Sequence, residues 1–109
     1  MVKQSTLDGW LLNHFSELLK KGSLYVAKTK IPIVLYRNTM EEEGESYQET
    51  ICTLTEGYVV IQVITSGGGI VPSVQQQLVF PIDEFPDWLM RQSKDLLQRC
   101  VDFLEDQLK

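Results

Sequence analysis

Residues 85–108, FPDWLMRQSKDLLQRCVDFLEDQL, decide most of what can be said about the fold of this chain. Apolar side chains recur at helical spacing along the stretch, so we expect one long amphipathic helix from Phe85 to Leu108. One side of this helix carries Phe85, Leu89, Leu96, Cys100, Phe103 and Leu104. A further apolar strip extends that side, and it consists of Met90, Leu97, Val101 and Leu108. Because the combined arc is wider than an ordinary core stripe, we predict that the strip binds a partner.

Trp88 falls outside this arc and is expected to pack over a sheet edge or to stand exposed as a contact residue. The predicted protein-binding residues are therefore Trp88, Met90, Leu97, Val101 and Leu108. The simplest partner is a second copy of the chain, so we expect a homodimer formed through the last helix or through the sheet. The sequence does not identify any other protein partner.

The composition is that of one small acidic domain. The chain has 109 residues, 43% of them hydrophobic, and a formal net charge of −5. This length supports one core, so we expect a single domain over residues 1–109. The sequence shows no apolar run suited to a membrane and no signal peptide, which predicts a cytoplasmic protein without a membrane partner.

Upstream of residue 85 the pattern changes from helix to strand. A capping-box spacing at Ser5 and the sequence Lys20-Lys21-Gly22 predict a helix over about residues 6–21. Branched and aromatic residues predict strands near residues 24–28, 31–37, 47–54, 58–65 and 78–82. The expected connections are an acidic loop at 41–46, a tight hairpin at Glu56-Gly57 and a flexible loop at 66–69.

These segments predict an α+β fold: an N-terminal amphipathic helix, a four- to five-stranded antiparallel sheet, and a long C-terminal amphipathic helix packed on one face. The other sheet face is expected to be polar, facing either water or a ligand. The residues assigned to it are Thr50, Thr53, Gln62, Thr65, Gln75 and Gln77.

The sequence contains little that suggests catalysis. His14 is the only histidine, and its place beside the apolar stripe of the first helix suits a boundary residue better than a general base. Cys52 and Cys100 are 48 residues apart without a CxxC pair, so we expect two buried free thiols. No ligand set has metal-site spacing. We therefore expect a binding protein that is not an enzyme, with no catalytic residues, no cofactor and no metal.

Charge is distributed in blocks along the chain. Residues 18–40 carry five basic side chains and no acid, whereas residues 38–90 carry nine acids and no base. The basic block and its tyrosines suggest single-stranded nucleic-acid binding as an alternative function. The residues concerned are Lys20, Lys21, Tyr25, Lys28, Lys30, Tyr36 and Arg37. The negative net charge disfavours this alternative.

The arrangement of these elements resembles two known groups of proteins. The segments 57–69 and 77–108 resemble the corresponding parts of the PUR and Whirly single-strand-binding proteins, a likeness that implies nucleic-acid binding through the sheet. The small acidic helix–strands–helix chain as a whole resembles the type III secretion chaperones, which implies a chaperone-like role, although the middle helix of that group is missing here.

A short N-terminal motif suggests a further alternative. Residues 4–11, QSTLDGWL, resemble the peptide by which replication and repair proteins bind the DNA sliding clamp. The matching residues are Gln4, Leu7, Trp10 and Leu11, with Leu11 in the place of the second aromatic residue. The same residues also suit a capped helix start that belongs to the domain core, and the two uses exclude each other.

Overall fold

The computed structural model describes residues 2–41, 46–67 and 70–109. The chain has an α+β fold, as predicted, with three helices and four strands in these residues. In chain order they are α1 (Val2–Thr29), β1 (Ile33–Glu41), β2 (Ser46–Leu54), β3 (Tyr58–Gly67), β4 (Ile70–Pro81), α2 (Phe85–Gln92) and α3 (Lys94–Gln107). Most of the predicted acidic loop and part of the glycine loop lie outside the described residues.

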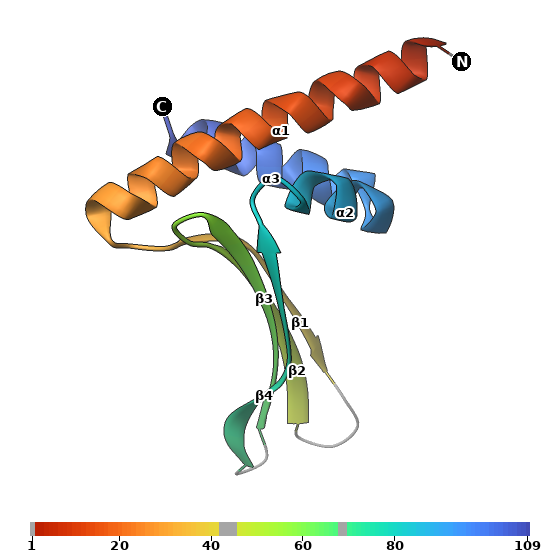
Figure 1. The fold of residues 1–109 in the computed structure, drawn as a ribbon. Coiled ribbons are helices and arrows are strands. Elements are labelled where there is room, and N and C mark those ends of the chain that lie inside the picture. Colours follow the sequence, from red (N-terminus) through yellow and green to blue (C-terminus); the bar gives the residue numbers. More distant parts are fainter. Residues whose placement is uncertain (1, 42–45, 68–69) are drawn as a thin grey trace.

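The four strands form one antiparallel sheet in the order β1-β2-β3-β4. The predicted hairpin at Glu56-Gly57 is confirmed: Gly57 has a φ of +85°, and the amide of Thr55 donates to the carbonyl of Tyr58 at 2.8 Å. The helices lie across one end of the sheet, and the strands run away from them (Figure 1). The radius of gyration is 15.5 Å, against about 13 Å for a compact chain of this length, so the molecule is elongated.

Helix α1 is longer than predicted because Gly22 does not end it. The apolar stripe continues through the glycine, with Leu18 before it and Val26 after it both buried. A Cβ at Gly22 would lie 2.6 Å from Cδ2 of Leu54 and 3.8 Å from Cδ2 of Leu104. The glycine therefore allows α1 to approach β2 and α3 closely, and it is a packing position.

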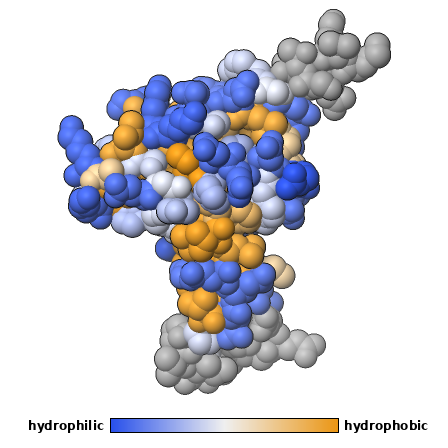
Figure 2. Space-filling view, in the orientation of Figure 1, coloured by the Kyte–Doolittle hydropathy of each residue, from blue (hydrophilic) through white to orange (hydrophobic). Residues whose placement is uncertain are grey.

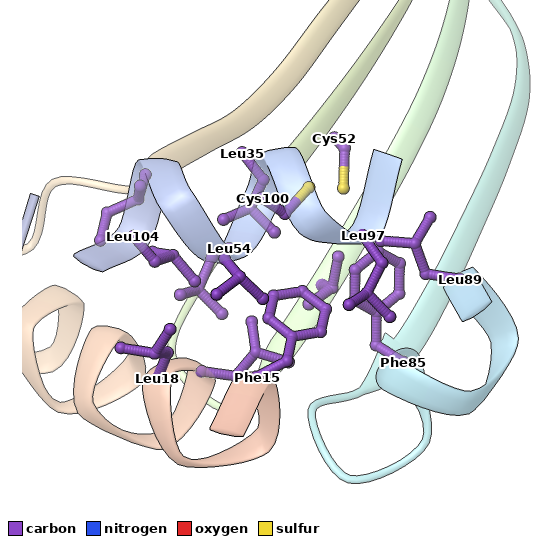
Figure 3. Close-up of a cluster of buried hydrophobic side chains, with 14 of the residues drawn as sticks. Phe15, Leu18, Leu35, Cys52, Leu54, Phe85, Leu89, Leu97, Cys100 and Leu104 are labelled. Carbon is purple, nitrogen blue, oxygen red and sulfur yellow. The ribbon is translucent and has the colours of Figure 1, made fainter. Parts of the chain in front are cut away.

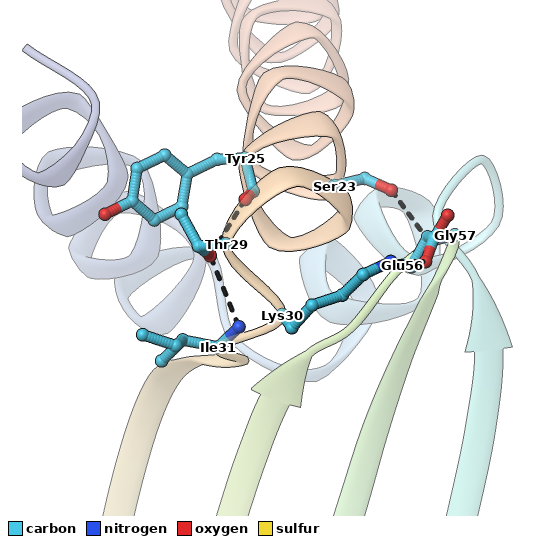
Figure 4. A network of polar contacts seen from close by, with 7 residues as sticks. All are labelled: Ser23, Tyr25, Thr29, Lys30, Ile31, Glu56 and Gly57. Atoms are coloured by element: carbon cyan, nitrogen blue, oxygen red, sulfur yellow. Dashed lines mark hydrogen bonds and ion pairs between the residues drawn. The ribbon is translucent and has the colours of Figure 1, made fainter.

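The predicted strand at residues 24–28 is wrong, because these residues form the last two turns of α1. The helix ends at Thr29, whose hydroxyl donates to the carbonyl of Tyr25 at 2.9 Å and accepts from the amide of Ile31 at 3.2 Å (Figure 4). Lys30 follows with a φ of +63°, the left-handed conformation that commonly ends a helix.

The C-terminal segment forms two helices instead of the single one predicted. Ser93 interrupts it with an extended backbone at φ −165° and ψ 110°. Its amide donates to the carbonyl of Leu89 at 2.8 Å, and its side chain accepts from the amide of Leu96 at 3.1 Å. Ser93 is thus the C-cap of α2 and the N-cap of α3. None of the helices in the described residues is both long and apolar enough to cross a membrane.

One core lies between the helices and the nearby half of the sheet (Figure 3). Helix α1 contributes Phe15 and Leu19, and the C-terminal helices contribute Phe85, Leu97 and others. On the sheet, the buried apolar residues are Ile33, Leu35, Cys52, Leu54, Val59 and Ile61. All six lie toward the ends of β1, β2 and β3 that meet the helices, so the helices cover one face of only about half of the sheet.

The packing role of Gly22 can be tested against Gly9, a second glycine of α1, where an added Cβ would have no atom within 4 Å. Gly22→Val should lower the free energy of unfolding by about 1–3 kcal/mol relative to Gly9→Val, because it overfills the contact with Leu54. Both changes carry the same difference in helix propensity. Urea unfolding followed by circular dichroism measures the difference, and equal values for the two variants would contradict a packing role.

Candidate protein-binding surface

The predicted binding strip on the last helix is mostly part of the core. The side chains of Leu97 and Val101 are 0% and 1% exposed and pack within their own chain. Met90 and Leu108 are half-buried and lie against the same core. The prediction that Leu97 and Val101 bind a partner is therefore wrong, because neither side chain reaches the surface.

The break at Ser93 explains this error. A continuous helix would spread the apolar residues over a wide arc, whereas two helices can each turn an ordinary stripe toward the core. In α3 the buried residues are Leu97, Cys100, Val101 and Leu104, which have the usual i, i+3, i+4 and i+7 spacing. The width of the predicted arc thus results from reading two helices as one.

Trp88, the remaining predicted contact residue, is half-buried at the junction of β4 and α2. Its ring lies 4.7 Å from that of Phe80 and 5.9 Å from that of Phe85, measured between centroids. It also lines an open depression of about 280 Å³. The other lining residues are Phe80, Asp83, Glu84, Asp87 and Arg91. Acidic residues at this position also suit the positive end of the α2 dipole, which explains them without a ligand.

The sheet face turned away from the helices is more apolar than predicted. Side chains alternate between the two faces of a strand, so the neighbours of the buried residues point to the opposite face. Arg37 and Glu49 lie on this side too, because they pair with Ile51 and Ile64. We name this the open face and define it by nine uncharged residues: Val34, Ile51, Thr53, Tyr58, Val60, Gln62, Ile64, Gln77 and Val79. None of the nine is buried, and Val79 is 52% exposed.

Three of the predicted polar residues, Thr53, Gln62 and Gln77, do lie on the open face. By the same alternation Thr50 and Thr65 belong to the other face, beyond the part that the helices cover. Hydrophobic atoms gather where the sheet leaves the helical layer and continue along it, interspersed with polar ones (Figure 2). The sheet therefore presents apolar side chains that no helix of the described chain covers.

His14 takes part in contacts between helices. Its ring stacks on Trp10 with centroids 5.0 Å apart, and its Nε2 lies 3.1 Å from Oε1 of Glu105 on α3. Within the described residues no three potential metal-ligating side chains come together. The arrangement around His14 links α1 to α3 and contains no nucleophile.

Both cysteines are free and buried, as predicted. Cys52 on β2 and Cys100 on α3 lie in the core, with their side chains near one another in Figure 3. Burial raises the pKa of the Cys100 thiol from 9.0 to about 12. Burial also raises the pKa of the Cys52 thiol, which has a hydrogen bond with the Tyr36 hydroxyl. The pKa of the Tyr36 hydroxyl is raised as well. Burial is the larger cause, and the neighbouring Cys52 is the next. These thiols are protonated at neutral pH and therefore unreactive.

The residues of the predicted nucleic-acid site do not share one surface of the sheet. Lys20, Lys21, Tyr25 and Lys28 lie on α1, Lys30 follows it, and Tyr36 and Arg37 lie on β1. Nζ of Lys30 lies 4.0 Å from Oε2 of Glu56, beside the hydrogen bond from the Gly57 amide to Ser23 Oγ (Figure 4). Tyr25 is exposed, whereas Tyr36 is half-buried and turned toward the core. This site stays a prediction, with Tyr25 as its exposed aromatic residue.

The predicted clamp-binding residues lie within the regular helix α1. Trp10 is 61% exposed, whereas Leu11 is buried in the core. Leu11 therefore cannot anchor the folded chain to a clamp, and that part of the prediction is wrong. The side chains of Gln4 and Leu7 lie outside the described residues, so their role stays a prediction.

Comparisons with protein-family models, with curated proteins and with solved structures found no match to this chain. The resemblances to single-strand-binding proteins and to secretion chaperones thus rest on sequence pattern alone.

The raised pKa values predict a loss of stability in alkali. Above pH 9 the unfolded chain loses the Cys100 proton while the folded chain keeps it until about pH 12, so unfolding becomes more favourable as the pH rises. Between pH 9 and 10 this residue should lower the free energy of unfolding by about 1 kcal/mol. Urea unfolding at both pH values measures the change. Cys100→Ala should show a smaller loss, and an identical loss in the variant would contradict the assignment.

Proposed function

We propose that this chain is a non-enzymatic protein-binding module that forms a homodimer through its sheet. The observation that carries the proposal is the uncovered part of the sheet, which extends beyond the helical layer (Figure 1). Exposed apolar side chains lie on this part, among them Val34, Tyr58 and Val79. Single exposed apolar residues are common on proteins, but contiguous apolar patches mark interaction surfaces. Part of the open face forms such a patch, because Val60 and Val79 are direct neighbours on adjacent strands.

Register supports the continuity of this surface. One row of the open face crosses all four strands and is mostly polar: it consists of Arg37, Ile51, Gln62 and Gln77. The next row supplies the apolar continuity, with three apolar side chains in four: it consists of Val34, Thr53, Val60 and Val79. Burying the apolar part of these rows against a partner would contribute about 25 cal/mol per Å² before the cost of association is subtracted.

The chemistry of the described side chains supports a role without catalysis. The histidine is engaged with Trp10 and Glu105, and the two thiols are enclosed in the core. A nucleophile needs a base within hydrogen-bond reach, and neither cysteine lies beside His14 in the described contacts. These observations favour binding as the function.

Ile51→Glu tests the sheet as the association surface. Ile51 lies opposite Arg37 on β1, so a glutamate there gains an opposite-charge cross-strand neighbour and should leave the fold intact. It also adds a further charged side chain to the open face, and because burying the resulting ion pair against a partner costs desolvation, the dimer should dissociate. Analytical ultracentrifugation should give about twice the chain mass of 12.5 kDa for the wild type and a value near the chain mass for the variant.

Leu24→Glu is the matched control, because Leu24 is an equally apolar and well-exposed residue on α1. This variant should sediment as the wild type does. If Leu24→Glu were monomeric while Ile51→Glu remained a dimer, the interface would lie on the helices. A monomeric wild type would contradict the proposal as a whole.

A further inference from the structure

The carboxyl end of α1 and the turn that follows it carry exposed apolar side chains. Leu24 is 71% exposed, Ile31 is 65% exposed, and Tyr25 between them is exposed as well. Their neighbour Val26 is buried, so α1 supplies its core stripe without them. These three side chains are therefore available to a partner.

Lysines surround these apolar side chains. Residues three or four positions apart share one face of a helix, so Lys20, Lys21 and Lys28 lie around Leu24. All three are exposed, and Lys30 directly precedes Ile31. We name this surface the basic apolar end of α1, and it consists of Lys20, Lys21, Leu24, Tyr25, Lys28, Lys30 and Ile31.

The charge of this surface is only partly neutralised. Nζ of Lys20 lies 3.8 Å from Oε1 of Glu17, and Nζ of Lys30 lies 4.0 Å from Oε2 of Glu56. Both pairs are exposed, and exposed ion pairs are weak. Within the described residues no carboxylate forms an ion pair with Lys21 or Lys28. This end of the molecule is therefore locally positive, although the chain as a whole is acidic.

Two acidic side chains near the end of α3, the helix that packs on α1, have other partners. Oε1 of Glu105 lies 3.1 Å from Nε2 of His14, and Oδ1 of Asp106 lies 3.9 Å from Nζ of Lys109. Neither carboxylate is drawn toward the lysines at the end of α1.

The shape of this surface limits what can bind it. The end of α1 and the turn to β1 project beyond the other helices and the sheet (Figure 1). Hydrophobic atoms lie among hydrophilic ones at this end, on the left of Figure 2. Projecting apolar side chains with lysines around them suit a surface into which they can insert, because the apolar parts leave water while the ammonium groups stay at the boundary.

We propose that the basic apolar end of α1 binds an anionic lipid surface. Leu24 and Ile31 enter the boundary between headgroups and acyl chains, and the lysines contact the headgroup charges. Such peripheral binding needs no spanning helix. It departs from the sequence-based expectation of no membrane partner, which rested on the lack of an apolar run and of a signal peptide. It is also independent of the proposed homodimer, because the open face lies on the sheet.

The apolar side chains favour lipid over nucleic acid as the polyanion. Proteins that bind single strands stack the bases on aromatic rings, and Tyr25 is the one aromatic residue of this surface. Leu24 and Ile31, its most exposed apolar residues, are aliphatic. Aliphatic side chains gain free energy in lipid but offer no ring for stacking.

Cosedimentation with vesicles tests the proposal. The wild type should bind vesicles of phosphatidylcholine with about one-third phosphatidylserine, and should not bind phosphatidylcholine alone. Lys28→Glu should lower the partition coefficient about tenfold, because it reverses a charge at the surface. Leu24→Ser should lower the partition coefficient about threefold or more, because it removes an inserted side chain.

Two matched variants serve as controls. Arg91→Glu makes the same change in net charge at an exposed position on α2, and Met40→Ser removes an exposed apolar side chain on β1. Both should bind the anionic vesicles as the wild type does. Circular dichroism of all four variants should match that of the wild type, since each position is exposed.

Three results would overturn the proposal. They are equal binding to both kinds of vesicle or to neither, an equal loss of binding in Arg91→Glu and Lys28→Glu, and retention of the wild type by a single-stranded oligonucleotide but not by anionic vesicles. The last result would assign the surface to nucleic acid. Lys28→Glu should still sediment as a dimer, so failure of the lipid proposal and failure of the proposed function are separate results.

Discussion

Incomplete coverage of the sheet by the helices is the constraint on which this structure depends. Three helices supply three apolar stripes, and all three converge on one end of the four-stranded sheet. The contact at Gly22 brings α1 within reach of Leu54 and Leu104, so the layers join closely there. Beyond this junction the strands continue without a helix against either face. The core is therefore small and well enclosed, and the remaining sheet provides the surface for association.

Much of the fold follows from local patterns in the sequence. Alternating and branched residues placed β2 and β3 to within a few residues, and the glycine at 57 marked their turn. Two positions misled the prediction because their roles depend on tertiary contacts. Gly22 has the sequence context of a helix end, yet it serves close packing, and the buried spacing of Leu18 and Val26 was the available signal. Ser93 could have been read as an N-cap, but the apolar spacing around it also fits a single helix.

The binding surface was harder to predict than the fold. The arc assigned to Met90, Leu97, Val101 and Leu108 presupposed one straight helix, so the break removed most of it from the surface. The open face requires the register of all four strands, because Val34, Ile51, Val60 and Val79 are far apart in sequence.

Hydrogen–deuterium exchange of the wild type tests the coverage of the sheet most directly. Burial of the open face against a second copy would slow the local opening of the central strands, so the amides of residues 51–54 and 58–62 should exchange slowly at high protein concentration. The additional protection should fall when the protein is diluted below its dimer dissociation constant. Exchange of these central amides at one rate at every protein concentration would contradict the account.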